Sequence, residues 1–291
     1  MKQQSKKSDK WSGKSRGGST GHAIFVFLIK NLGIQVAYTL LALVVIYFIP
    51  FAHKATSAIW RYNRQILKYG IFKSIIKLYQ HYYVFGQTLI DKIAIVNELS
   101  YKYKFDFEDY DKFINLLDSG SVVMIGAHVG CWEIGAEFFG DYASKLNVVM
   151  YDAEYEKIKE QVDTSRFGYK IIPINNGGIE SLLKIKQAID NGEYVCFQGD
   201  RYTQEGSHCE VTFMGKKAKF PTGPSLIGSK FKTPIIFYFA MRERGRRYRF
   251  IFKSLEGDLS QNEILKSYIN IFEGVVKKYP QQWFNFYDVW Q

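Results

Sequence analysis

His128 and Glu133 are residues whose types and spacing can support catalysis. The segment GAHVGCWEIG, residues 126–135, places the histidine just after an apolar run and the carboxylate five positions later. On one continuous helix, residues five positions apart are separated by about 500° of rotation, so their side chains do not line up. Across a strand–turn–helix corner bent at Gly130, however, the carboxylate can reach a ring nitrogen. A histidine oriented in this way can remove a proton from a hydroxyl group.

Simpler explanations of these residues stay open. The spacing also arises by chance, and a histidine at a strand end can simply hydrogen-bond the backbone. Cys131 is a second nucleophile candidate, although cysteine is commonly a small buried residue. The remaining cysteines, Cys196 and Cys209, with His208, lack the spacing of a zinc site. Because the GxxxxGK[ST] and GxGxxG nucleotide-binding patterns are also missing from the sequence, we expect no metal and no resident cofactor.

Alternating strands and helices, from about Tyr101, must position the histidine. Apolar runs predict strands over residues 121–127, 147–150, 170–174 and 193–200. Helical spacing predicts helices over 179–189, before Gly192, and from Ile264 to Pro280, and two apolar runs around Gly245 predict a hairpin. We therefore predict an α/β fold with a mixed, largely parallel sheet flanked by helices. His128 would lie at the carboxyl edge of that sheet, where ligands bind in such folds.

The positive charge of the chain is concentrated near its beginning. Residues 1–90 hold thirteen Lys and Arg and one acid, Asp9, a net charge of +12, whereas the remainder holds 26 basic and 27 acidic residues. Such a segment indicates attraction to an anionic surface. The apolar stretch inside it favours a membrane over nucleic acid. Three cysteines without a CxxC pair are typical of a reducing compartment.

The organisation of the chain follows from these patterns. We predict four regions along the chain. They are a disordered basic tail over residues 1–21, an apolar membrane anchor over 22–52, basic amphipathic interfacial helices over 53–100, and the catalytic domain over 101–291. The anchor is interrupted by Lys30, Asn31, Gln35 and Pro50, so one span, a shallow hairpin and a buried helix pair are all compatible with it. Apolar residues at helical spacing over 57–85, with basic residues between them, predict a helix in the headgroup plane or packed on the domain.

Four segments together resemble a known family. HVGCWE (128–133) resembles the HX4(D/E) box of the lysophospholipid acyltransferase superfamily. Three further segments follow in the same order as in the lauroyl/myristoyl acyltransferases of lipid A biosynthesis. They are GDRYTQEG (199–206), the segment 213–239 and YPQQWFNFYDVW (279–290). A basic N-terminus with an apolar anchor precedes them, and the resemblance covers about residues 11–291. PTGP stands near the position of that superfamily's FPEGTRS block but lacks its Glu and Arg, and Gln281 replaces a usual Glu.

The resemblance implies a membrane-bound acyltransferase. His128 would be the general base on an acceptor hydroxyl or amine, oriented by Glu133, with an acyl thioester of acyl carrier protein or coenzyme A as donor. The acceptor would be a lipid A precursor or related membrane lipid, at the cytoplasmic side of the bacterial inner membrane. Candidate substrate-binding residues are Asp200, Arg201, Lys219, Thr222 and Gly223. A thioesterase or lipid hydrolase that uses water, and a non-catalytic membrane adaptor, are the alternatives; nothing in the sequence indicates the oligomeric state.

Overall fold

A computed structural model describes residues 19–136, 140–151, 168–174, 178–202 and 206–290 of the chain. The predicted disordered tail lies outside the described residues, except for its last three residues. Those three residues begin helix α1 (Ser19–Asn31).

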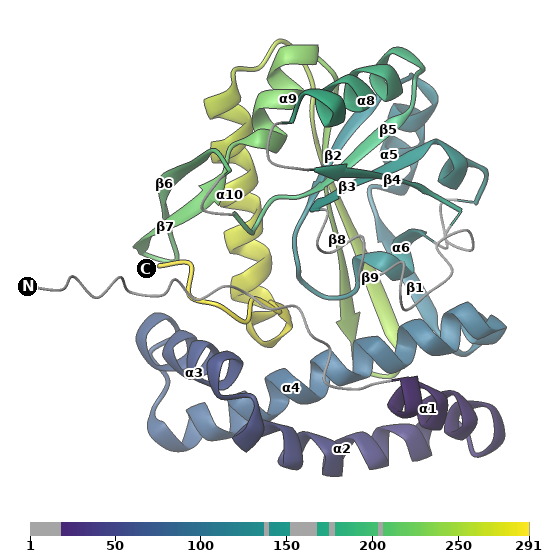
Figure 1. Ribbon diagram of the computed structural model, residues 1–291, viewed down its shortest axis with the longest axis vertical. Helices are drawn as coiled ribbons and strands as arrows, with labels where there is room; N and C mark the ends of the chain where they lie inside the picture. Colours follow the sequence, from purple (N-terminus) through teal and green to yellow (C-terminus); the bar gives the residue numbers. More distant parts are fainter. Residues whose placement is uncertain (1–18, 137–139, 152–167, 175–177, 203–205, 291) are drawn as a thin grey trace, which may run out of the picture.

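A seven-stranded sheet forms the centre of the molecule, in the order β1-β9-β8-β2-β5-β3-β4 (Figure 1). Its strands are β1 (Lys104–Glu108), β2 (Val122–Gly126), β3 (Leu146–Tyr151), β4 (Lys170–Ile174), β5 (Tyr194–Gln198), β8 (Ile235–Glu243) and β9 (Arg247–Leu255). All neighbouring pairs are parallel except β8 and β9, which form an antiparallel hairpin. The mixed, mostly parallel sheet flanked by helices confirms the predicted fold class.

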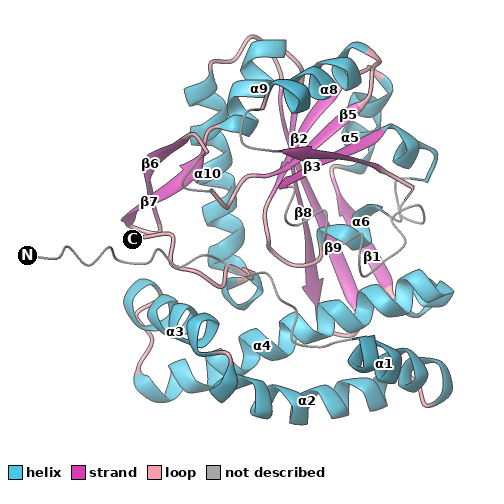
Figure 2. Ribbon diagram, viewed as in Figure 1, coloured by secondary structure: helices cyan, strands magenta, loops and turns pink. Residues whose placement is uncertain are grey.

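Helices cover both faces of this sheet (Figure 2). Every residue of β2 is buried, as expected for a central strand of a parallel sheet with two covered faces. Val122 and Met124 belong to one hydrophobic cluster and Val123 and Ile125 to another, because alternate side chains of a strand point to opposite faces. The first cluster includes residues of α2 (Ile34–Phe51), α4 (Ile71–Ala94) and α5 (Tyr110–Asp118). The second includes residues of α8 (Ile179–Asp190), α9 (Gly223–Phe231) and α10 (Gln261–Lys278).

Several elements of the fold had no counterpart among the predicted ones, and helix α5 is one of them. Strand β1 pairs with β9 at the edge of the sheet. Strands β6 (His208–Phe213) and β7 (Lys216–Pro221) form a separate antiparallel hairpin. Helix α9 follows β7 directly. The remaining short elements are α6 (Trp132–Ala136), the 3-10 turns Ser100–Lys102, Gly140–Lys145 and Pro280–Gln282, and the π-helical turn Ile95–Leu99.

The amphipathic region predicted over 57–85 is two helices rather than one. Helix α3 (His53–Arg61) continues into a π-helical turn, Tyr62–Ile66, and α4 begins only at Ile71. The break changes which apolar residues are covered: Ile59 and Tyr62 are buried, whereas Phe72 and Ile76 are exposed. Within the described residues, one helix, α2, is long and apolar enough to cross a membrane by length and composition.

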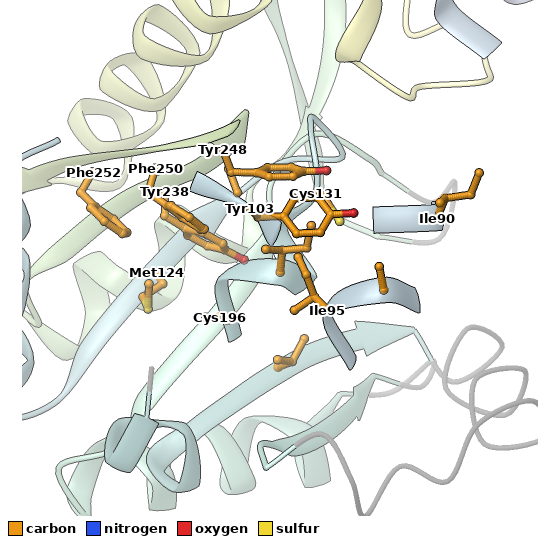
Figure 3. Packing of buried hydrophobic residues seen from close by; sticks show 14 of the residues in the cluster. Ile90, Ile95, Tyr103, Met124, Cys131, Cys196, Tyr238, Tyr248, Phe250 and Phe252 are labelled. Atoms are coloured by element: carbon orange, nitrogen blue, oxygen red, sulfur yellow. The ribbon is translucent and has the colours of Figure 1, made fainter. Parts of the chain in front are cut away.

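A buried carboxylate joins the helical layer to the sheet. Asp91 on α4 accepts hydrogen bonds from the hydroxyl groups of Tyr38, Tyr103 and Tyr248 and from Nε of Arg242, the last at 2.8 Å. Figure 3 shows Tyr103 and Tyr248 of this cluster close to Cys131. Asp91 and Tyr248 are fully buried. Arg242, on β8, is held by this buried carboxylate, and its own side chain is only 10% exposed.

Candidate active site

His128 and Asp200 meet at the carboxyl edge of the sheet. His128 follows β2 and Asp200 follows β5, and these two strands are adjacent and parallel. Nδ1 of His128 lies 2.7 Å from Oδ1 of Asp200, and the same oxygen accepts a 3.0 Å hydrogen bond from the backbone N–H of His128. Two neighbouring parallel strands thus deliver a histidine and a carboxylate to one point, the edge at which open α/β sheets bind ligands.

The partner of Nδ1 determines which ring nitrogen of His128 can act as a base. An ionised carboxylate only accepts hydrogen bonds, so the proton of the neutral ring is assigned to Nδ1. Nε2 then carries the lone pair and makes no hydrogen bond to another described residue. Because the His128 side chain is 22% exposed while Asp200 is fully buried, the imidazole is the accessible part of the pair. This arrangement suits general-base chemistry.

Charge and hydrogen bonds keep Asp200 ionised. Burial raises the pKa of this carboxyl, but the charge and hydrogen bond of His128, the charge of Arg201 and the indole of Trp283 outweigh burial and lower the pKa from 3.8 to about 2. Trp283 donates from Nε1 to Oδ2 over 3.0 Å. Both carboxylate oxygens are therefore satisfied.

The lowered pKa of Asp200 predicts an acid-sensitive contribution to stability. A carboxyl with a depressed folded-state pKa stabilises the fold above its unfolded value and loses that contribution as pH falls toward the folded value. We expect a contribution on the order of 2 kcal/mol at neutral pH that disappears between about pH 4 and pH 2. Urea unfolding at several pH values measures it, and wild type and Asp200→Asn should converge in stability toward pH 2. A constant difference between them across this range would contradict the prediction.

The segment after α10 closes the site. Trp283 pairs with Val129 in an antiparallel bridge, and the N–H of Phe284 donates to the carbonyl oxygen of His128 over 2.8 Å. Gln282 accepts from the N–H of Gly130 through its backbone carbonyl, and its side-chain amide pairs with both backbone groups of Arg242. These contacts fix the backbone at His128 and in the two residues after it.

Gly130 provides the bend that the sequence predicted. Its φ of +59° lies in the left-handed region. A Cβ at this position would also meet the backbone of Ala240 on β8, with the carbonyl carbon at 2.9 Å. Only glycine satisfies both requirements without strain.

Substitution of Gly130 should therefore destabilise the protein. We expect Gly130→Ala to lower the free energy of unfolding by about 2 kcal/mol or more, because the added methyl group combines backbone strain with a clash. Gly274→Ala is the matched control. Gly274 lies inside α10 with open space around it, so alanine there should stabilise by about 0.5–1 kcal/mol. Equal effects of the two substitutions in urea titrations would count against this view of the bend.

Glu133 has a different partner from the predicted one. Its Oε1 lies 2.7 Å from Nζ of Lys92 on α4, and both side chains are about one-third exposed. Burial lowers the pKa of Lys92, but the charge and the hydrogen bond of the Glu133 carboxylate outweigh burial, so the pKa is raised. Glu133 does not accept the predicted hydrogen bond from the ring of His128; Asp200, predicted as a substrate ligand, pairs with Nδ1 instead. A spacing of five across the corner turns the glutamate toward α4.

The other predicted substrate residues have partners of their own or lie at the start of a helix. Arg201 donates from Nη2 to the carbonyl oxygen of Phe284 over 2.9 Å. Lys219 on β7 lies with its ammonium 6.0 Å from the ring centre of Tyr202. Thr222 and Gly223 form the start of α9, and neither makes a hydrogen bond to His128 or Asp200 within the described part of the chain.

Cys131 is a buried thiol. It is 4% exposed, and burial raises its pKa, with a further contribution from Glu133. A raised pKa disfavours the thiolate that a nucleophile requires. In the described ranges, no group of three or more His, Cys, Asp and Glu side chains comes together as metal ligands would.

Sequence patterns named Asp200 but not its role, and they did not single out Lys92, Gln282 or Trp283. The segment 279–290 did stand out as one of the four family-like blocks. Its aromatic composition and its place after the last helix were the signals available for Trp283.

Fold and site together define an α/β protein with a histidine–carboxylate pair at the carboxyl edge of a largely parallel sheet. The sequence model of the family described as bacterial lipid A biosynthesis acyltransferase matches residues 22–291. The chain therefore belongs to this family, which indicates lipid A acyltransferase activity and lipid and acyl-donor substrates. Together with the apolar helix α2, the family also suggests association with a membrane. Comparison with curated proteins finds none that matches the chain.

Proposed function

We propose that the protein transfers a fatty acyl chain from an acyl thioester to a hydroxyl or amine of a lipid A precursor or related lipid. The observation that carries this proposal is the 2.7 Å contact between Asp200 and Nδ1 of His128, which leaves Nε2 with its lone pair to act as the base. The family match supplies the class of reaction.

Nε2 of His128 takes the proton of the acceptor hydroxyl as its oxygen attacks the thioester carbonyl carbon. A tetrahedral intermediate forms and collapses, the carbon–sulfur bond breaks, and the leaving thiolate recovers the proton from the imidazolium. Asp200 holds the proton on Nδ1 throughout and stabilises the imidazolium by its charge. General-base assistance of this kind is worth about 10²–10⁴ in rate.

Two further groups of residues have proposed supporting roles. Glu133 and Lys92 position the corner that carries His128, because their ion pair ties the start of α6 to α4. Arg201, and Lys219 beside the ring of Tyr202, supply positive charge toward a substrate phosphate. Thr222 and Gly223 remain proposed contacts of the substrate at the start of α9.

The cytoplasmic side of the bacterial inner membrane is the proposed location. The three cysteines are free, which is compatible with a reducing compartment. A donor thioester of acyl carrier protein or coenzyme A is available in that compartment, and the acceptor lipid is reached from the membrane.

Purified protein in detergent tests the reaction. It is incubated with an acyl thioester labelled in the acyl chain, with and without a lipid A precursor. We expect label in the lipid only when both substrates are present, from the donor that the enzyme accepts. Label released as free fatty acid regardless of acceptor would show a hydrolase instead. Absence of turnover with either thioester and several acceptor lipids would overturn the proposal.

A further inference from the structure

Helix α2 packs along α4 rather than projecting from the molecule. Ala37, Leu41 and Val45 of α2 are buried, and a Cβ at Gly86 of α4 would meet Leu41, with its Cγ at 3.1 Å. This glycine lets the two helices approach closely. Figures 1 and 2 show α1, α2 and α4 together along one edge of the molecule, opposite α8 and α9.

Polar contacts hold α2 against α4 and the sheet near its beginning, middle and end. Tyr38 donates its hydroxyl proton to Asp91 and accepts from Nη2 of Arg242, which comes from β8. Tyr79 donates to the carbonyl oxygen of Ala42 over 3.1 Å. Thr56, just past the end of α2, donates to the carbonyl oxygen of Ile49 and is 2.9 Å from the hydroxyl of Tyr82. To cross a bilayer without α4 and the sheet, α2 would have to release these partners.

The opposite side of these helices exposes apolar residues. On α2, Leu43, Ile46 and Tyr47 are each more than 60% exposed. Among residues whose burial the structure describes, the exposed large apolar residues of α1, the turn after it, α2 and α4 up to position 76 are Ile24, Phe27, Leu32, Val36, Leu43, Ile46, Tyr47, Phe51, Ile71, Phe72, Ile75 and Ile76. We call this set the apolar face. Exposure of so many apolar side chains to water is unfavourable. The face is therefore an interaction surface.

Charge identifies the partner of the apolar face. No acidic residue lies between Asp9 and Asp91, while Lys54, Arg64, Lys68 and Lys73 are exposed around the same helices. Basic side chains beside exposed aromatic and aliphatic ones are typical of helices that lie in the headgroup region of an anionic bilayer.

We propose that α1, α2 and the first turns of α4 lie in the plane of the membrane, with the apolar face inserted into one leaflet and no segment of α2 crossing the bilayer. If α2 stood upright in its packed position, α4 would stand with it, carrying Lys73, Lys77, Asp91 and Lys92 into the hydrocarbon core. Charged groups at that depth are strongly unfavourable. This inference rests on the proposed membrane location. It places the bilayer one helix away from the catalytic corner, since α4 also contacts Cys131 and Glu133.

Matched substitutions test the contribution of α4. Phe72→Glu/Ile76→Glu places two charges on the apolar face, whereas Ile179→Glu/Leu183→Glu places two charges on α8, where the residues are 74% and 62% exposed. With vesicles of phosphatidylglycerol and phosphatidylethanolamine, we expect the first pair to weaken partitioning about tenfold or more and the second to leave it unchanged. Equal partitioning of all three proteins would overturn the proposal.

Topology is measured independently. In a Cys209→Ser background, Asn31→Cys and His53→Cys place exposed thiols at the two ends of α2. A membrane-impermeant maleimide applied to sealed inside-out and right-side-out vesicles should label both positions from the same side. Labelling from opposite sides would show that α2 spans. Acyl transfer by the same variants in detergent separates this inference from the proposed function, because turnover there does not depend on insertion.

Discussion

Replacement of His128 by alanine should reduce the turnover number for acyl transfer by about 10²–10⁴-fold. The variant lacks the only group that we assign to removal of the acceptor proton. Its fold should persist, because Asp200 keeps the hydrogen bonds from the backbone N–H of residue 128 and from Trp283. The loss of one hydrogen bond to a charged group should lower stability by about 1.5–3 kcal/mol. Initial rates with saturating substrates in detergent, together with urea titrations, measure both effects.

Cys131→Ala is the control for this prediction. The buried thiol takes no part in the proposed reaction, so the variant should keep its turnover number within about fivefold of wild type, apart from the modest effect of a small core substitution. The opposite pattern, with activity lost in Cys131→Ala and kept in His128→Ala, would assign the nucleophile to the thiol and refute the mechanism.

Replacement of Asp91 by leucine should produce a large loss of stability. Asp91 is the common acceptor of three tyrosine hydroxyls and of Arg242, whose side chain is only 10% exposed. Its removal leaves a buried guanidinium without its counter-charge. Breaking a buried ion pair in this way destabilises by about 3–5 kcal/mol. The midpoint of urea unfolding measures the loss, and loosening of α2 should accompany it, because Tyr38 loses its acceptor.

Asp106→Asn is the matched control for Asp91. Asp106 pairs with Arg247 at 3.4 Å, and both side chains are more than 40% exposed. An exposed pair of this kind contributes about 0–1 kcal/mol. Similar losses in the two variants would show that the buried carboxylate does not organise the junction between helices and sheet.

The sequence predicted elements correctly where an apolar pattern is bounded by turn residues such as glycine. Residues 170–174 form a strand as predicted, and the hairpin turns at Gly245, which has a φ of +74°. The bend at Gly130 was predicted from residue type alone. The helix over 57–85 was predicted too long, because a helical apolar pattern continues across Leu67–Gly70 although the chain leaves the helix there. The spacing of apolar residues does not reveal such a break when the same helical spacing continues on both sides of it.

The partner of His128 could not be found from local spacing. Glu133 is near in sequence, whereas Asp200 is 72 positions away and comes close only because β2 and β5 are neighbours. In chain order β3 and β4 stand between them, so strand order has to be known first. The contribution of Trp283 likewise depends on the return of the last segment across the sheet edge.

The tautomer of His128 tests the central claim most directly. The five histidines are labelled with ¹⁵N, and the ring signals of His128 are assigned by their loss in His128→Ala. At a pH where the ring is neutral, we predict a protonated Nδ1 and an unprotonated Nε2 in wild type and in Glu133→Gln, and a change in both signals in Asp200→Asn. A proton on Nε2 in wild type, or signals that respond to Glu133→Gln but not to Asp200→Asn, would contradict the assignment of Asp200 as the residue that prepares the base.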